Sequence, residues 1–373
     1  GLHPEDALPF CMVDSPDGRP YTLGGFLTSA TCARADAGGS IRYSDGGESE
    51  NQALSLQFLP FNNEIARVEE HIRACVQAEG RLLQEVAEHC NLGGGKKLRP
   101  RFLILVAQAV SGSKQTDDAV LRAAAAVELV HVASLLHDDV IDKTTMRRGR
   151  PSVNARFGDN VAILMADLLF AHAFDLALST LDPQVTRLIA QTTRQMCESE
   201  IFQIEKAGQN LSREDYYYII RCKTAALFSL CAEVGGVLGG ATGETRRTLA
   251  EFGRLIGMTY QITDDVLDYT ALGEQWGKPQ GHDLSEGKLT LPIVYTCEQA
   301  SPQDREALLG ELRNGRQMDR VLPLLRKYGG LEFSEEQARS FAREAEGLIP
   351  SLALRQSADL FQALCRFAAD RAF

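Results

Sequence analysis

Two short acidic motifs are the stretches of this sequence whose residue types and spacing most clearly indicate chemistry. Both have the spacing Asp-Asp-x-x-Asp, and both follow a long apolar stretch. The six acidic residues are Asp138, Asp139, Asp142, Asp264, Asp265 and Asp268. Carboxylate oxygens are hard ligands, so Mg²⁺ shared between these carboxylates and phosphate oxygens fits better than zinc or a caged calcium ion. One such motif alone is equally well read as a solvated acidic turn, but its recurrence favours the metal.

The position of the first motif supports this interpretation. Residues 121–136 are apolar almost all round, which predicts a buried helix that ends in the motif. The C-terminal end of a helix carries partial negative charge, so clustered carboxylates there are unfavourable without a cation. Asp138 and Asp142 should share one helix face, about 6 Å apart along the axis. If the two acidic helix ends face each other, they form a cage for several divalent ions whose other ligands come from a diphosphate.

Composition restricts the class of protein. The chain has 373 residues, is 44% hydrophobic and carries a net charge of −11. Its basic residues stand in short clusters that suit small anions, and these features together exclude a nucleic-acid-binding surface. Nine cysteines with no Cys-x-x-Cys pair indicate neither a disulfide framework nor a zinc site, so a reducing, cytoplasmic compartment is expected, with an organellar one left open. We expect no membrane-spanning segment and see no signal peptide.

The chain is predicted to contain a leader and one catalytic domain. Residues 1–55 are rich in Gly, Ser, Asp and Pro without periodicity, which predicts a flexible leader. Residues 56–373 show helical periodicity and no useful strand-type alternation, so the fold is predicted to be all-α. Ser212 and Ser334, each followed by acidic residues, are predicted to begin helices, the latter as a capping box. The triple tyrosine at 216–218 is interpreted as packing and surface.

Five stretches resemble the trans-isoprenyl (polyprenyl) diphosphate synthases. They are GGGKKLRP before the first motif, AVELVHVASLLHDD through it, RRGRPSVN after it, KTAAL between the motifs, and GKPQGHDLSEGKLTLP after the second. They keep the family's order and approximate spacing from about residue 64 to the C-terminus. The resemblance implies the isoprenoid-synthase helical bundle around a deep central cavity, and a homodimer.

The resemblance also implies two substrate sites. Residues that match the family's isopentenyl diphosphate site are Gly95, Lys96, Arg99, His131 and Arg148. Residues that match its allylic diphosphate site, for farnesyl or geranylgeranyl diphosphate, are Arg147, Lys223, Thr224 and Lys278, and Gln261 is also assigned to substrate binding. Taken without the family, His131 reads as a satisfied core histidine and Lys223 as an exposed lysine.

The implied reaction is ionisation, condensation and elimination. Three Mg²⁺ ions with bound diphosphate are expected on the six aspartates, with Asp138, Asp142, Lys223 and Asp264 as the catalytic residues. The released diphosphate is the expected base for the final proton. Ala133 and Ser134, five and four residues before the first motif, are small where short-chain members carry aromatic residues, so a long-chain product is predicted. Such an apolar product implies transient contact with a membrane.

Two other functions remain open at this point. A terpene cyclase on the same fold ionises a prenyl diphosphate but does not need the complete isopentenyl diphosphate site. A non-catalytic regulatory subunit of a prenyl synthase is expected to have lost acidic ligands, whereas both motifs are intact here.

Overall fold

The computed structural model of the protein describes residues 59–77, 80–90, 92, 95–147, 149–206, 211–270, 281–315, 317–352, 354 and 357–370. The chain divides into two compact units, Gly1–Asn51 and Gln52–Phe373, and every described residue belongs to the second. The leader predicted at residues 1–55, together with Arg148 and Lys278, lies outside the described residues.

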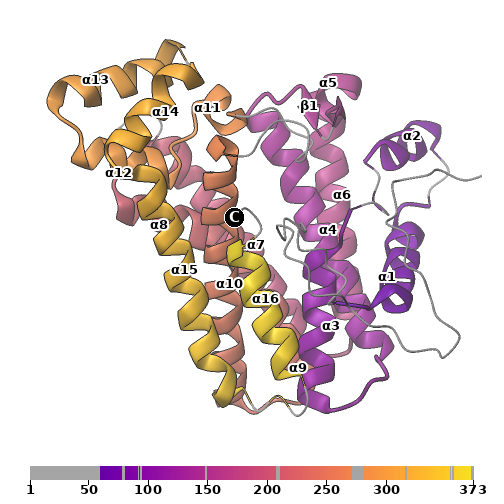
Figure 1. The fold of residues 1–373 in the computed structure, drawn as a ribbon. Coiled ribbons are helices and arrows are strands. Elements are labelled where there is room, and N and C mark those ends of the chain that lie inside the picture. The colour runs from indigo at the N-terminus through magenta and orange to yellow at the C-terminus, as the bar shows by residue number, and fades with distance from the viewer. Residues whose placement is uncertain are drawn as a thin grey trace, which may run out of the picture. The chain divides into compact units, whose positions relative to one another are not determined.

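Helices make up nearly all of the described chain, which confirms the all-α prediction (Figure 1). The elements as far as the first motif are α1 (Asn62–Cys75), α2 (Arg81–His89), α3 (Leu98–Ser111) and α4 (Asp118–Ile141). Those between the motifs are β1 (Met146–Arg147), β2 (Arg150–Pro151), α5 (Val153–Phe157), α6 (Asp159–Leu178), α7 (Pro183–Lys206), α8 (Arg213–Ile220), the π-helix η2 (Arg221–Ala225) and α9 (Ala226–Leu238). The second motif ends α10 (Gly243–Thr270). After it come α11 (His282–Glu286), α12 (Leu291–Gln299), α13 (Pro302–Gly310), the π-helix η4 (Glu311–Gly315), α14 (Met318–Lys327), α15 (Gly330–Leu348), the 3₁₀ turn η5 (Ile349–Ser351) and α16 (Ala358–Asp370).

Two long helices carry the acidic motifs at their C-terminal ends. Helix α4 packs among α1, α3, α6 and α9, and its run of alanines at 123–126 is fully buried (Figure 1). Helix α10 packs against α9, η2, α15 and α16. Gly257 permits the close approach of α10 to η2, because a Cβ there would lie 2.5 Å from the Cα of Ala225. Since η2 contains the Lys-Thr pair, this packing fixes the pair beside the second motif.

Two helices differ from the expectation about membranes. By length and composition alone, α4 and α6 are apolar enough to cross a membrane, a length that no apolar run was expected to reach. In the structure these two helices pack against each other, and the qualifying window of α4 is 67% buried while that of α6 is 33% buried. Helix α6 therefore leaves much of an apolar surface exposed.

One predicted helix start is confirmed and the other is wrong. Ser212 caps α8 in a capping box with Asp215. Ser334 instead lies inside α15, fully buried, and its hydroxyl donates to the carbonyl oxygen of Gly330 at 2.7 Å. The helix starts one turn earlier because Gly329 takes the left-handed conformation, φ 71°, that precedes it.

Candidate functional site

The first motif lies where α4 ends, and two lysines from distant elements contact it. Asp142 is the residue after the helix, and its backbone N–H donates to the carbonyl oxygen of Asp138 at 2.8 Å. The Nζ atom of Lys223 lies 3.4 Å from Oδ2 of Asp138, and that of Lys288 lies 3.2 Å from Oδ2 of Asp142. The structure thus brings the predicted Asp138, Asp142 and Lys223 together.

Lys223 belongs to the π-helix η2, a rare geometry that often marks functional sites. It also donates to Oε2 of Glu200 on α7 at 2.6 Å. Burial raises the pKa of Asp138, and Glu200 and Asp142 raise it further, against the opposing effect of Lys223. Burial alone would lower the pKa of Lys223, but Asp138 and Glu200 outweigh it and raise that pKa. Glu200 was not predicted as a site residue, and the polar character of α7 was its only signal.

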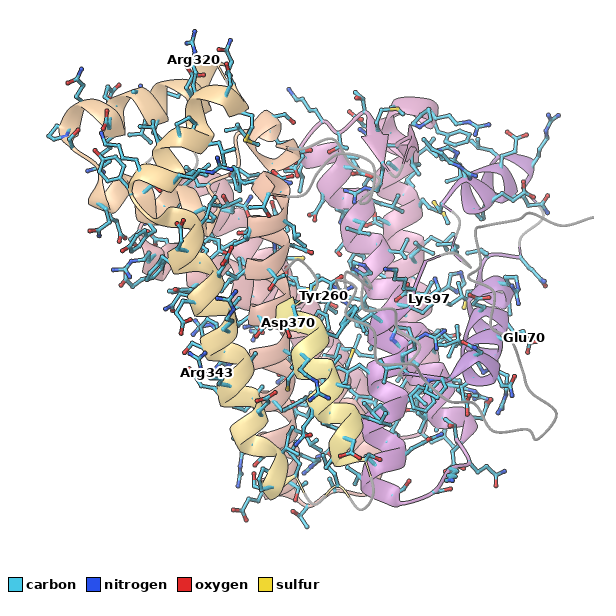
Figure 2. All side chains as sticks on the ribbon, viewed as in Figure 1. Glu70, Lys97, Tyr260, Arg320, Arg343 and Asp370 are labelled. Carbon is cyan, nitrogen blue, oxygen red and sulfur yellow. The ribbon has the colours of Figure 1, made fainter. Side chains whose placement is uncertain are left out.

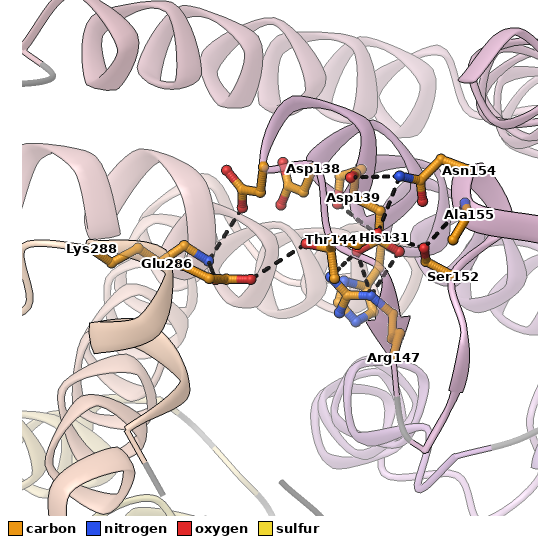
Figure 3. A network of polar contacts seen from close by, with 12 residues as sticks. His131, Asp138, Asp139, Thr144, Arg147, Ser152, Asn154, Ala155, Glu286 and Lys288 are labelled. Atoms are coloured by element: carbon orange, nitrogen blue, oxygen red, sulfur yellow. Dashed lines mark hydrogen bonds and ion pairs between the residues drawn. The ribbon is translucent and has the colours of Figure 1, made fainter. Parts of the chain in front are cut away.

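Lys288 follows α11 and holds this segment against the first motif (Figure 3). Its Nζ lies 2.6 Å from Oε2 of Glu286, whose Oε1 accepts a hydrogen bond from the hydroxyl of Thr144 at 3.4 Å. Burial acts to lower the pKa of Lys288, but Asp142 and Glu286 outweigh it, so the pKa is raised well above its usual value. The ammonium group therefore stays charged beside the motif.

Asp139 points into the protein and holds Arg147. The guanidinium Nε and Nη2 both donate to Oδ1 of Asp139, at 2.8 and 2.5 Å, and Nε also reaches Oδ2 at 2.9 Å (Figure 3). The Asn154 side chain donates to the carbonyl oxygens of Asp139 and Thr144, at 3.1 Å each. These hydrogen bonds hold the β1–β2 hairpin against the end of α4 and fix the orientation of the Arg147 side chain.

The second motif is anchored in a similar way. Asp265 is 3% exposed and accepts hydrogen bonds from Tyr216 and Gln261. Burial and the charge of Asp283 raise the pKa of Asp265 to about 7, although Tyr216 and Gln261 oppose the shift. Oδ2 of Asp268 accepts the backbone N–H of Asp283 at 3.0 Å, which ties the start of α11 to the end of α10.

The glycine-lysine turn before α3 adopts left-handed backbone at two positions. Gly95 has φ 90° and Lys97 has φ 49°. The Arg99 guanidinium lies over the Phe228 ring, 5.0 Å from the ring centre, and its buried Nε has no hydrogen-bond partner within the described part of the chain. A partly buried guanidinium whose Nε has no partner among the described residues suits an anion, as predicted for Arg99. Lys96 beside it is exposed.

His131 and the two predicted chain-length residues lie on α4 before the motif. His131 is half-buried, and its carbonyl oxygen accepts a hydrogen bond from the Ser134 hydroxyl at 2.8 Å. Ala133 is fully buried. The Ser134 hydroxyl is therefore already hydrogen-bonded to the backbone of this turn. The side chains of Ala133 and Ser134 are both small and uncharged.

The donor set fits Mg²⁺ when a diphosphate supplies further ligands. Among the described residues, no group of three or more His, Cys, Asp or Glu side chains is placed to hold a metal ion. The nearby donors are carboxylate oxygens on two helix ends, and Mg²⁺ is commonly held by one or two carboxylates together with substrate phosphates and water. The chemistry of the residues present therefore matches that ion, with each motif as one part of its shell.

Comparison with known proteins gives consistent matches across most of the chain. A model of the family described as polyprenyl synthetase matches residues 80–326. The octaprenyl diphosphate synthase of Escherichia coli is 33% identical over 286 residues, which are 76% of this chain and 88% of that protein. The short chain isoprenyl diphosphate synthase of Methanothermobacter thermautotrophicus is 34% identical over 71% of this chain and 82% of that protein.

A solved structure agrees in fold. The crystal structure of a polyprenyl synthase from Caulobacter crescentus, in complex with calcium and isoprenyl diphosphate, superposes with a TM-score of 0.79 at 30% identity, covering 86% of this chain and 98% of that one. The isoprenoid-synthase fold predicted from the motifs is confirmed. The chain belongs to the polyprenyl synthetase family.

Proposed function

We propose that this protein is a trans-prenyltransferase that adds isopentenyl diphosphate units to an allylic diphosphate, farnesyl or geranylgeranyl, to make a long-chain polyprenyl diphosphate. The observation that carries the proposal is the meeting of Lys223 and Lys288 with Asp138 and Asp142 at the end of α4. Alternating carboxylates and fixed cations are what a metal-bound diphosphate leaving group requires.

The two motifs, at the C-terminal ends of α4 and α10, would together hold three Mg²⁺ ions when the diphosphate is bound. Such ions neutralise a departing diphosphate and so lower the barrier to ionisation. The candidate ligands are Asp138, Asp142, Asp264 and Asp268. Asp139 and Asp265 are buried and already hydrogen-bonded, so their role is to orient the neighbouring Arg147 and Gln261.

The ionisation, condensation and elimination steps can each be assigned to groups at this site. Lys223, Lys288, Arg147 and Lys278 stabilise the diphosphate as its C–O bond breaks and it keeps the electron pair. The double bond of isopentenyl diphosphate attacks the allylic carbon, and the resulting cation loses a proton to the released diphosphate. The neighbouring carboxylates raise the pKa of both Lys223 and Lys288, so both ammonium groups are charged before metal and substrate bind.

Isopentenyl diphosphate would bind at the turn before α3. Arg99 offers its unpaired Nε, while Lys96 is exposed and free to approach a phosphate. The family resemblance assigns His131 and Arg148 to the same site. A terpene cyclase has no need of such a second diphosphate site, so the buried Nε of Arg99, which has no partner among the described residues, favours chain extension.

Relatives of similar identity are described as octaprenyl and as short-chain synthases, so they do not decide the product length of this chain. The proposal for product length therefore comes from the residues of α4. Ala133 is fully buried one turn and a half before the motif, and Ser134 next to it is small. A growing chain that passes these positions meets no aromatic side chain from them. We infer a product longer than geranylgeranyl.

The protein is proposed to work as a homodimer. Helices α6 and α7 pack against each other and expose large apolar side chains. These are Leu164, Leu178, Ile201 and Ile204, with 68, 61, 67 and 55% exposure. Such a surface suits a second copy of the chain. Sedimentation of the wild type as a dimer, and of Leu164→Glu as a monomer, would support this; a monomeric wild type would contradict it.

The function is tested by incubating the purified chain with Mg²⁺, labelled isopentenyl diphosphate and either farnesyl or geranylgeranyl diphosphate. A ladder that ends in one dominant long polyprenyl diphosphate is expected. Cyclised hydrocarbon as the sole product would establish the cyclase instead. Product that forms only after a second protein is added would establish a subunit role.

A further inference from the structure

A chain of hydrogen bonds joins three helical segments and ends beside Lys223. The Tyr216 hydroxyl donates to Oδ2 of Asp265 at 2.6 Å, and Nε2 of Gln261 donates to Oδ1 of the same carboxylate at 2.8 Å. The Thr224 hydroxyl donates to Oε1 of Gln261 at 2.7 Å. These hydrogen bonds run from α8 through α10 to η2, so they tie the contiguous α8 and η2 to the distant α10.

The direction of every bond in this chain is fixed from the carboxylate. The Tyr216 hydroxyl and the Gln261 amide each donate to a different oxygen of the Asp265 carboxylate. When the amide NH₂ of Gln261 faces Asp265, its carbonyl oxygen faces Thr224. Only the hydroxyl proton of Thr224 can pair with that oxygen, so the amide orientation decides where the proton points.

This direction matters at Thr224. With its proton committed to Gln261, the threonine oxygen keeps its lone pairs for a positive charge. Thr224 is next to Lys223, whose Nζ lies 3.4 Å from the Asp138 carboxylate. In the proposed reaction, positive charge develops on the allylic carbon as the diphosphate leaves. An oxygen that presents lone pairs stabilises such a charge, and one that presents a proton opposes it.

We propose that Tyr216 and Asp265 are positioning residues that set the Gln261 amide and thereby the direction of the Thr224 hydroxyl. Both are 3% exposed, so they act through Gln261 and not on the substrate. The inference rests on the proposed function, because it requires a developing allylic cation. It gives Tyr216 a functional role, whereas the sequence placed the triple tyrosine in packing and surface.

The test compares two neighbouring tyrosines. Tyr216→Phe removes one donor from Asp265, whereas Tyr217→Phe removes a hydroxyl that donates to Gln337 at 3.2 Å, away from the chain of bonds. Tyr216→Phe should lower kcat about tenfold and leave both KM values within about twofold. Tyr217→Phe should behave as the wild type. A Tyr216→Phe enzyme with unchanged kcat would overturn the inference.

A double-mutant cycle separates positioning from a general structural effect. If Tyr216 acts through the threonine hydroxyl, then Tyr216→Phe should cause no further loss of kcat in a Thr224→Val background. Losses that multiply would show that the two residues act independently and would overturn the inference. Should Tyr216→Phe fail to fold, Asp265→Asn replaces it in the cycle. The new amide can donate to Gln261 and so reverse the direction of the hydrogen bonds from residue 265 to Thr224. We therefore expect a larger loss of kcat, again absent in the Thr224→Val background.

One measurement tests the geometry without turnover. Hydrogen exchange of the Gln261 side-chain amide, followed by NMR in protein labelled at glutamine nitrogen, should be at least about fivefold faster in Tyr216→Phe than in Tyr217→Phe. If the wild type does not elongate substrate but amide exchange is faster in Tyr216→Phe, the proposed function is refuted and the hydrogen bonds from Tyr216 to Gln261 are still supported. If the wild type elongates substrate but exchange is equal in both variants, the positioning role of Tyr216 is refuted while the proposed function remains supported.

Discussion

The buried pair of Lys97 and Glu128 gives a prediction whose size follows from the structure. The Lys97 side chain is 1% exposed and that of Glu128 is 10% exposed, and their Nζ and Oε1 atoms lie 3.2 Å apart. Nζ also donates to the carbonyl oxygen of Leu92 at 2.6 Å. Figure 2 shows Lys97 among the helices. Lys97→Met leaves a buried carboxylate without its counter-ion, which should cost about 3–5 kcal/mol in free energy of unfolding.

The double variant Lys97→Met with Glu128→Leu should recover most of that loss. Replacing both charges by apolar groups of similar volume removes the desolvation cost, so its free energy of unfolding should lie within about 1 kcal/mol of the wild type. Arg81→Met is the matched control, since Arg81 pairs with Glu85 at 2.8 Å but is 92% exposed. Its expected cost is under about 0.5 kcal/mol.

The assay is guanidinium unfolding of the four proteins, followed by the KM for isopentenyl diphosphate. The pair joins the Lys96 turn to α4 one turn before His131, so the double variant should fold well and still bind isopentenyl diphosphate about tenfold more weakly. A cost below about 1 kcal/mol for Lys97→Met would refute the reasoning, because it would mean that Glu128 is effectively solvated.

Three further predictions concern the site. Since the pKa of Asp265 rises from 3.8 to about 7 on folding, the native protein binds the extra proton between those values, and its stability without metal should fall as pH rises through that window. The slope should approach about 1.4 kcal/mol per pH unit and be reduced in Asp265→Asn, as thermal unfolding across the pH range would show. Ala133→Phe should shorten the product, and chain-length analysis that shows an unchanged product would contradict the predicted path. Glu200→Gln removes a partner of Lys223, so it should strengthen the contact of that lysine with Asp138 and weaken Mg²⁺ binding several-fold by calorimetry; equal affinity would contradict this.

Local sequence features predicted the helices and the motifs. The apolar run at 121–136 and the carboxylates that follow it are neighbours in sequence, so a helix ending in acid could be inferred directly, and α4 ends at Ile141 as expected. Capping at Ser212 is local in the same way. At Ser334 the local signal failed because α15 already begins at Gly330, after the left-handed Gly329 and where the chain packs closely against Pro292 and Thr296.

Contacts between distant residues could not be predicted. Nothing in the spacing of residues signals that Tyr216 reaches Asp265, 49 positions later, or that Glu200 pairs with Lys223. The close approach of α10 at Gly257 to the π-helical turn that contains Lys223 is also a property of packing. The sequence therefore indicated the groups that are proposed to do chemistry, and the fold decided which of them contact each other.

The arrangement of charges links the binding of metal and diphosphate. Lys223 and Lys288 occupy the same carboxylate oxygens, on Asp138 and Asp142, that a divalent ion would use. An ion that binds there must displace these ammonium groups, which is unfavourable unless they gain another anion nearby. A diphosphate supplies that anion, since its oxygens can accept from both lysines while they complete the shell of the ion. Metal and diphosphate should therefore bind more tightly together than either does alone, because each removes the electrostatic penalty of the other.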